Sequence, residues 1–147
     1  MTKSWAYGAA LVLGMHLLWF ALIFTEAHAD WVMPAIIMLF FATMNIAGLA
    51  AFVTAWRAPR HPLLLALSMA PLTAVLATLF NLLLDAAGTH VDFSGFRGNA
   101  GLFGISLAYG IFVSLVGAGI GIWLARRQAR ATATPEYVPL VGPEPNK

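Results

Sequence analysis

The chain has 147 residues, of which 61% are hydrophobic and only 10% are charged. Soluble domains carry about 25% charged residues, so a soluble fold of this composition could not cover its surface with polar groups. The composition therefore predicts an integral membrane protein whose solvent is lipid. The basic residues behind the net charge of +2 sit in short clusters between apolar stretches, which argues against nucleic-acid binding. Because the chain contains no cysteine, disulfides, thiolate nucleophiles and cysteine-held iron–sulfur or zinc sites are excluded.

Four apolar stretches follow one another along the chain, and each is long enough to cross a bilayer as a helix. They cover about residues 5–25, 31–56, 62–85 and 101–125. A hydrocarbon core of roughly 30 Å needs about 20 helical residues, and continuous apolarity does not fit the alternating strands of a barrel. We expect an all-α polytopic membrane protein, with a four-helix transmembrane bundle formed by residues 1–130.

The segments that flank these stretches carry opposite charges. The first and third connections hold four carboxylates, Glu26, Asp30, Asp85 and Asp92, and one arginine, Arg97. The N-terminus, the second connection and the C-terminal flank hold six further basic residues, which are Lys3, Arg57, Arg60, Arg126, Arg127 and Arg130. The positive-inside rule then predicts an inner (plasma) membrane protein with both termini in the cytoplasm. Tryptophans at the stretch ends, where indole rings prefer the membrane interface, support the same boundaries: Trp5, Trp31, Trp56 and Trp123.

The two ends of the chain differ in what they predict. The sequence Ala27-His28-Ala29 resembles a signal-peptide cleavage site, but the preceding apolar stretch exceeds the about 7 to 15 residues of a signal peptide, so we expect it to be retained. Residues 131–147 contain prolines, threonines and glutamates that cannot build a core. They predict a disordered, proline-rich cytoplasmic tail.

Small residues and a proline indicate how the apolar stretches pack. In the fourth stretch, small side chains recur at helical spacing and form a helix-packing stripe, comprising Ser106, Gly110, Ser114, Ala118, Gly117 and Gly121. Such a stripe allows close backbone approach in lipid, so we expect another helix against it. A helix of the same chain is favoured, although a homodimer remains open.

In the third stretch, Pro71 leaves the carbonyl of Leu67 without its helical partner, which predicts a kink.

A midplane polar layer contains one residue from each stretch, roughly 16 to 18 Å from the cytoplasmic ends: His16, Asn45, Thr73 and Ser114. We expect these side chains to face inward and to hydrogen-bond one another, since unpaired polar groups are costly in hydrocarbon. The simpler interpretation is that these side chains only join the helices through hydrogen bonds. The functional one makes His16 a proton carrier or a ligand in a solute site. A bis-histidine haem is disfavoured because His16 is the one intramembrane histidine.

A second set of polar residues lies toward the outside. Thr78, Asn81 and Asp85 share one helical face. The outer connections add carboxylate and imidazole groups that would suit a divalent metal such as zinc or a cation vestibule: Glu26, His28, Asp30, His90 and Asp92. Their spacing lacks the H-E-x-x-H pattern, so a solvated loop is the simpler interpretation and no cofactor is predicted.

The third connection also contains two phenylalanines and an arginine, Phe93, Phe96 and Arg97. The aromatic rings either cap the bundle at the membrane interface or form an external recognition loop for another protein.

No catalytic signature accompanies these features: G-x-S-x-G, P-loop and H-E-x-x-H patterns are missing from the sequence. We therefore expect a non-catalytic protein that binds another membrane protein, as an accessory subunit or an immunity-type partner, or that forms a homo-oligomer. The alternative is a small oligomeric transporter or channel for an ion or solute, using the midplane histidine and asparagine and the acidic outer vestibule. An enzyme ranks last.

Overall fold

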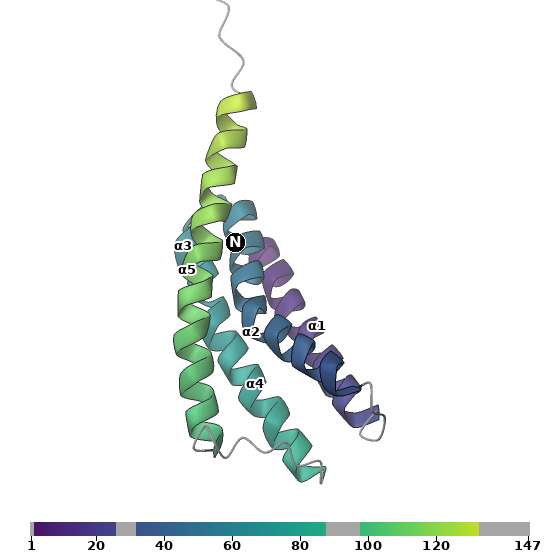
Figure 1. Cartoon of the computed structure of the whole chain (residues 1–147). Helices are drawn as coiled ribbons and strands as arrows, with labels where there is room; N and C mark the ends of the chain where they lie inside the picture. The colour runs from purple at the N-terminus through teal and green to yellow at the C-terminus, as the bar shows by residue number, and fades with distance from the viewer. Residues whose placement is uncertain (1, 26–31, 88–97, 133–147) are drawn as a thin grey trace, which may run out of the picture.

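The computed structural model describes residues 2–25, 32–87 and 98–132, and within these ranges all regular structure is α-helical (Figure 1). The helices are α1 (Thr2–Thr25), α2 (Val32–Arg57), α3 (Pro62–Leu67), α4 (Met69–Ala86) and α5 (Gly98–Thr132). Because one residue, Ser68, separates α3 from α4, the two together form the third of four long rods. The all-α prediction is confirmed for this part of the chain.

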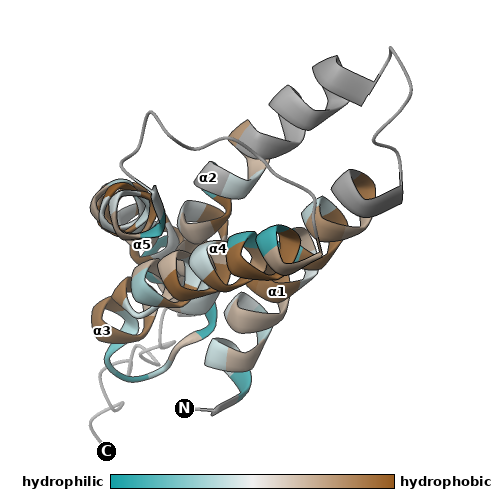
Figure 2. Ribbon diagram, turned by 90° about the horizontal axis from the view of Figure 1, so that it is seen from below, coloured by the Kyte–Doolittle hydropathy of each residue, from teal (hydrophilic) through white to brown (hydrophobic). Residues whose placement is uncertain are grey.

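Three of the described helical segments are long and apolar enough to cross a membrane. They are Lys3–Leu22, Pro62–Ala86 and Gly98–Thr132. Large apolar side chains also cover much of the outer surface. In Figure 2 hydrophobic colour covers large parts of the helices, while the α2–α3 connection and the first turn of α1 are hydrophilic. Length, composition and surface together are those of a membrane protein.

The last helix is longer than its apolar stretch. α5 has 35 residues, three more than the stretch at its start and seven more at its end. At about 1.5 Å per residue it extends over about 50 Å, which exceeds a hydrocarbon core of roughly 30 Å. Its last two turns therefore extend past the core. Residues 131 and 132, the first two of the predicted disordered tail, are helical, and the rest of that tail, residues 133–147, lies outside the described ranges.

The interruption between α3 and α4 follows from Pro71. Proline has no N–H to donate to the carbonyl four residues earlier, so the helical bonding is broken one turn before it. Ser68 occupies the break, and its hydroxyl donates to the carbonyl of Leu65 at 2.7 Å while accepting from the indole of Trp5 at 3.0 Å. The kink predicted from Pro71 thus corresponds to a break in the helix at Ser68.

Glycine residues bring α5 into backbone contact with both of its neighbours. A methyl group on Gly117 would collide with the carbonyl oxygen of Gly48 in α2, and one on Gly110 would lie 3.3 Å from the Cα of Ala70 in α4. All six residues of the helix-packing stripe are buried. The helices that lie against the stripe are α2 and α4 of the same chain.

Positive charge gathers at one end of the bundle. The indole of Trp56 donates to the side-chain oxygen of Gln128 at 2.9 Å, and the guanidinium of Arg57 lies 4.5 Å from the ring centre of Tyr7. These contacts place the start of α1, the end of α2 and the last part of α5 at the same end of the bundle, where α5 extends beyond the other two helices (Figure 1). We call this the basic end; its cations are Lys3, Arg57, Arg60, Arg126, Arg127 and Arg130.

A methyl group at the contact between α2 and α5 should destabilise the bundle. For Gly117→Ala we expect a loss of about 1 to 3 kcal/mol, because the atom it meets is a backbone carbonyl that cannot rotate away. Thermal unfolding in a mild detergent measures the effect. Gly119→Ala is the matched control, because nothing lies within 4 Å of its added carbon, and we expect no loss there. Equal melting temperatures for the two variants would contradict the contact.

Candidate functional site

The buried histidine of the midplane layer stacks on an aromatic ring of another helix. His16 is 1% exposed, and its Nδ1 lies 2.7 Å from the carbonyl oxygen of Val12 one turn earlier. Its ring stacks on Phe80 of α4 with 6.0 Å between centroids, and Phe80 in turn packs against Phe20. Nε2 is buried without a hydrogen-bond partner. With Nδ1–H donating to the carbonyl, Nε2 presents a lone pair to apolar surroundings.

The midplane residues do not form the network expected of them. The hydroxyl of Thr73 donates to the carbonyl of Met69 at 2.8 Å, and that of Ser114 donates to the carbonyl of Ala47 in α2 at 3.3 Å. Hydroxyl groups in helices can use backbone carbonyls, so they do not need one another. Asn45 departs further from the expectation, because its side chain is exposed rather than directed inward.

On the outward polar face of α4, one of the three predicted side chains bonds to α5. The hydroxyl of Thr78 donates to Ala74, and the amide of Asn81 donates to the side-chain oxygen of Asn99 at 2.7 Å. Asp85 is partly exposed near the end of α4. Thr78 and Asn81 therefore use their donors inside the bundle, where the Asn81–Asn99 bond joins α4 to the first turn of α5.

The outer connections cannot be placed in the same way. The candidate metal or cation residues, Glu26, His28, Asp30, His90 and Asp92, and the recognition-loop residues, Phe93, Phe96 and Arg97, lie outside the described ranges. Among the residues that the structure does describe, no group of three or more histidine, aspartate or glutamate side chains could hold a metal ion.

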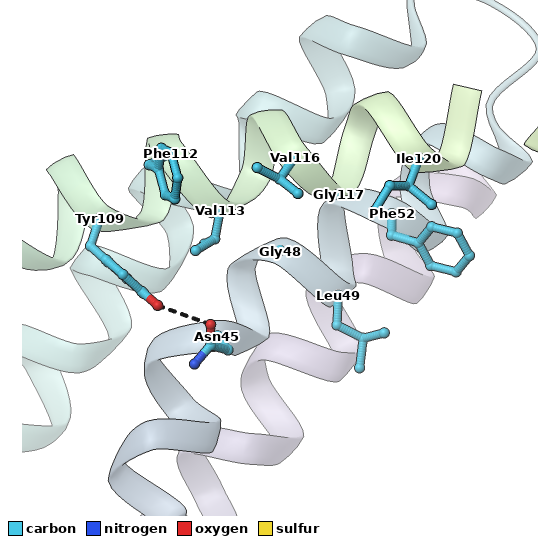
Figure 3. A pocket seen from close by; sticks show the side chains of 10 residues that line it. All are labelled: Asn45, Gly48, Leu49, Phe52, Tyr109, Phe112, Val113, Val116, Gly117 and Ile120. Carbon is cyan, nitrogen blue, oxygen red and sulfur yellow. Dashed lines mark hydrogen bonds between the residues drawn. The ribbon is translucent and has the colours of Figure 1, made fainter. Parts of the chain in front are cut away.

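A groove of about 440 Å³ runs between α2 and α5 on the outer surface of the bundle (Figure 3). Its floor is the contact between Gly48 and Gly117, where neither helix has a side chain to fill the space. Its walls are apolar side chains that point outward, such as Phe112, which is 63% exposed, and Val116, which is 51% exposed. The lining residues are Asn45, Gly48, Leu49, Phe52, Tyr109, Phe112, Val113, Val116, Gly117 and Ile120.

A polar pair lies at one end of this groove. The hydroxyl of Tyr109 donates to the side-chain oxygen of Asn45 at 3.0 Å, as the dashed line in Figure 3 shows, and the amide nitrogen of Asn45 donates to the carbonyl of Phe41 at 2.8 Å. Asn45 lies twelve residues before Arg57, which is about 18 Å along the helix from the basic end. The pair is therefore well inside the apolar length of α2 and faces outward.

The amide of Asn45 retains hydrogen-bonding capacity. A carboxamide has two N–H donors and an oxygen with two lone pairs, and the two bonds described above use one of each. Asn45 is an exposed residue, so a partner at the surface of the bundle can reach this second N–H. A polar donor that faces hydrocarbon costs free energy unless an acceptor reaches it.

Sequence reasoning identified Asn45 but not Tyr109. A signal was present: Tyr109 lies well inside an apolar stretch, whereas tyrosine in membrane helices is typical of the interface. A hydroxyl at that depth needs a partner, and an asparagine on another stretch was available. The sequence does not reveal how α2 is rotated about its own axis, and this rotation turns Asn45 toward α5.

No known protein family matches the sequence, and neither a curated protein nor a solved structure is similar to the chain. The groove and its polar pair are therefore interpreted from their own chemistry.

Removing the tyrosine hydroxyl should weaken the link between α2 and α5 without unfolding the chain. For Tyr109→Phe we expect a loss of about 0.6 kcal/mol, the average for interhelical bonds in membranes. Unfolding free energies of Tyr109→Phe, Asn45→Leu and the double variant, measured in the same detergent, give the coupling between the two side chains. Tyr7→Phe is the control for loss of an exposed hydroxyl elsewhere. Fully additive losses would show that the two side chains are not coupled.

Proposed function

We propose that the chain is a four-span inner-membrane protein with both termini in the cytoplasm, and that it acts without catalysis by binding a helix of another membrane protein between α2 and α5. The observation that carries this proposal is the exposed polar pair, Asn45 and Tyr109, at the end of an otherwise apolar groove. An accessory subunit or an immunity-type partner would work in this way.

The proposal counts α2 as a membrane span in addition to the three candidate spans described above. This helix has 26 residues, and its sequence from Val32 to Trp56 contains no charged side chain. It packs along α1 and α5, which are both candidate spans. The basic end supports the orientation, because cytoplasmic flanks of membrane proteins are enriched in lysine and arginine.

A protein helix fits the groove better than lipid chains do. Lipid tails are as apolar as leucine, so in the bilayer no hydrophobic force drives a helix into a groove. Close packing and interhelical hydrogen bonds can do so, and the glycine floor permits close packing. An acyl chain offers no acceptor to the second N–H of Asn45, whereas a backbone carbonyl or polar side chain of a partner helix does.

The transport alternative receives less support from the geometry. It needs a route from Asp85 to the imidazole of His16 through the bundle. Phe80 stacks on that imidazole and is itself 8% exposed, and Leu84, one turn closer to Asp85, is 1% exposed. Side chains are therefore packed along this part of α4 in the conformation described.

Because the chain contains no cysteine, single cysteines can be introduced to test its orientation without labelling of native thiols. In intact spheroplasts, a membrane-impermeant maleimide should label Ala87→Cys, at the exposed end of α4 opposite the basic end. Thr2→Cys and Ala131→Cys should react only after lysis. Labelling of either terminal cysteine in intact cells would reverse the proposed orientation.

The groove itself can be tested by photo-crosslinking in native membranes. A benzophenone amino acid at Val116 should give a discrete adduct with another protein, attached within one of that protein's membrane helices. Leu18 on α1 is the matched control, because it is 50% exposed and Val116 is 51% exposed. Asn45→Leu should reduce the Val116 adduct several-fold while the melting temperature shows that the bundle is intact.

Two results would contradict the binding proposal. One is equal adduct yields from Val116 and Leu18, since the groove would then be no more occupied than any other surface that faces lipid. The other is an adduct formed only between two copies of this chain, which would make the groove a homo-oligomer contact.

A further inference from the structure

α5 projects beyond the helix it packs against. The backbone of Trp56, the last but one residue of α2, lies beside Gly121 of α5, because a methyl group on Gly121 would be 3.1 Å from the backbone nitrogen of Trp56. From Gly121, α5 continues for about three turns to Thr132. The arginines on this part of α5, Arg126, Arg127 and Arg130, are exposed.

One face of α5 changes from apolar to aromatic to cationic as it leaves the groove. Ile120, Trp123, Arg127 and Arg130 follow one another at intervals of three and four residues, so they share one side of the helix. Ile120 is 50% exposed and is the groove-lining residue of α5 nearest the basic end, and Trp123 is 58% exposed. A phospholipid presents the same order of acyl chain, interfacial glycerol and phosphate.

Arg127 on this face is held in position by a neighbouring aromatic ring. The guanidinium carbon of Arg127 lies 5.5 Å from the ring centre of Trp123. A guanidinium held over an aromatic ring keeps its planar N–H donors available at its edge, where they can bind two phosphate oxygens together. The indole also belongs to a residue type that prefers the depth of the lipid headgroups.

The positive charge at this end has no counter-charge among the described residues. The basic end carries six cations, and the carboxylate within residues 2–25, 32–87 and 98–132 is Asp85, at the opposite end of the bundle. Juxtamembrane clusters of four to eight basic residues attract anionic lipids.

We propose that an anionic phospholipid binds to this face of α5, with its phosphate on Arg127 and Arg130, its glycerol region beside Trp123 and the start of an acyl chain along Ile120. A soluble phosphate would make no use of the exposed apolar residues below the arginines. An acidic protein would leave Trp123 and Ile120 in lipid without a role. The phospholipid uses all four side chains, and this inference goes beyond the binding of a partner helix.

Quenching of tryptophan fluorescence by brominated lipids tests the proposal with the full-length chain in vesicles of phosphatidylcholine and phosphatidylglycerol. At equal mole fractions, brominated phosphatidylglycerol should quench more strongly than brominated phosphatidylcholine, and Trp123→Phe should remove most of that difference. Arg127→Gln with Arg130→Gln should lower the preference for phosphatidylglycerol by about fivefold or more. Asn45→Leu should leave it unchanged, which separates this site from occupation of the groove.

Arg60→Gln is the matched control, because it removes a positive charge from the same end of the bundle but from the turn between α2 and α3 rather than from the proposed face of α5. A preference that survives the double variant, or that Arg60→Gln lowers equally, would mean that the end attracts lipid only through its net charge and would overturn the proposed site. Loss of the preference in millimolar inorganic phosphate at constant ionic strength would show that the arginines bind phosphate without its lipid, which would also overturn it. A cooperative thermal unfolding transition establishes that each variant is folded.

Discussion

The backbone contact between α2 and α5 is the constraint on which the remaining features depend. Water does not drive helices together inside a bilayer, so the bundle must gain its stability from close packing and from interhelical hydrogen bonds. Gly48 and Gly117 permit the closest approach that two helices can make. At such a distance many van der Waals contacts and Cα–H···O interactions form along the crossing.

The same contact creates the groove. Where two glycines meet there is no side chain to fill the space outside the crossing, while Leu49 and Val116 beside them rise above it. The site proposed for a partner helix is therefore a direct result of the packing that holds α2 and α5 together. Stability and binding are then linked, because a larger residue at the crossing would alter both.

Much of the helical architecture was predictable because its causes are local. Apolar length predicted where the rods lie, and Pro71 predicted the break that the structure places at Ser68. The direction of Asn45 was not predictable, because depth follows from helical rise but orientation depends on how α2 is rotated by its contacts with α5. The expected network failed for a related reason: Thr73 and Ser114 bond to backbone carbonyls, so a shared depth does not make polar side chains meet.

The short helix α3 has a mechanical consequence. It has six residues, it starts after His61, whose backbone is left-handed with φ of 50°, and it ends at the break beside Ser68. His61 is not helical, whereas Ser68 keeps helical backbone angles of φ −66° and ψ −12°. The third rod therefore continues through Ser68 and lacks the one backbone hydrogen bond that Pro71 cannot donate. The indole of Trp5 donates to the hydroxyl of Ser68, so the first rod is tied to the third at the place where the third has lost this bond.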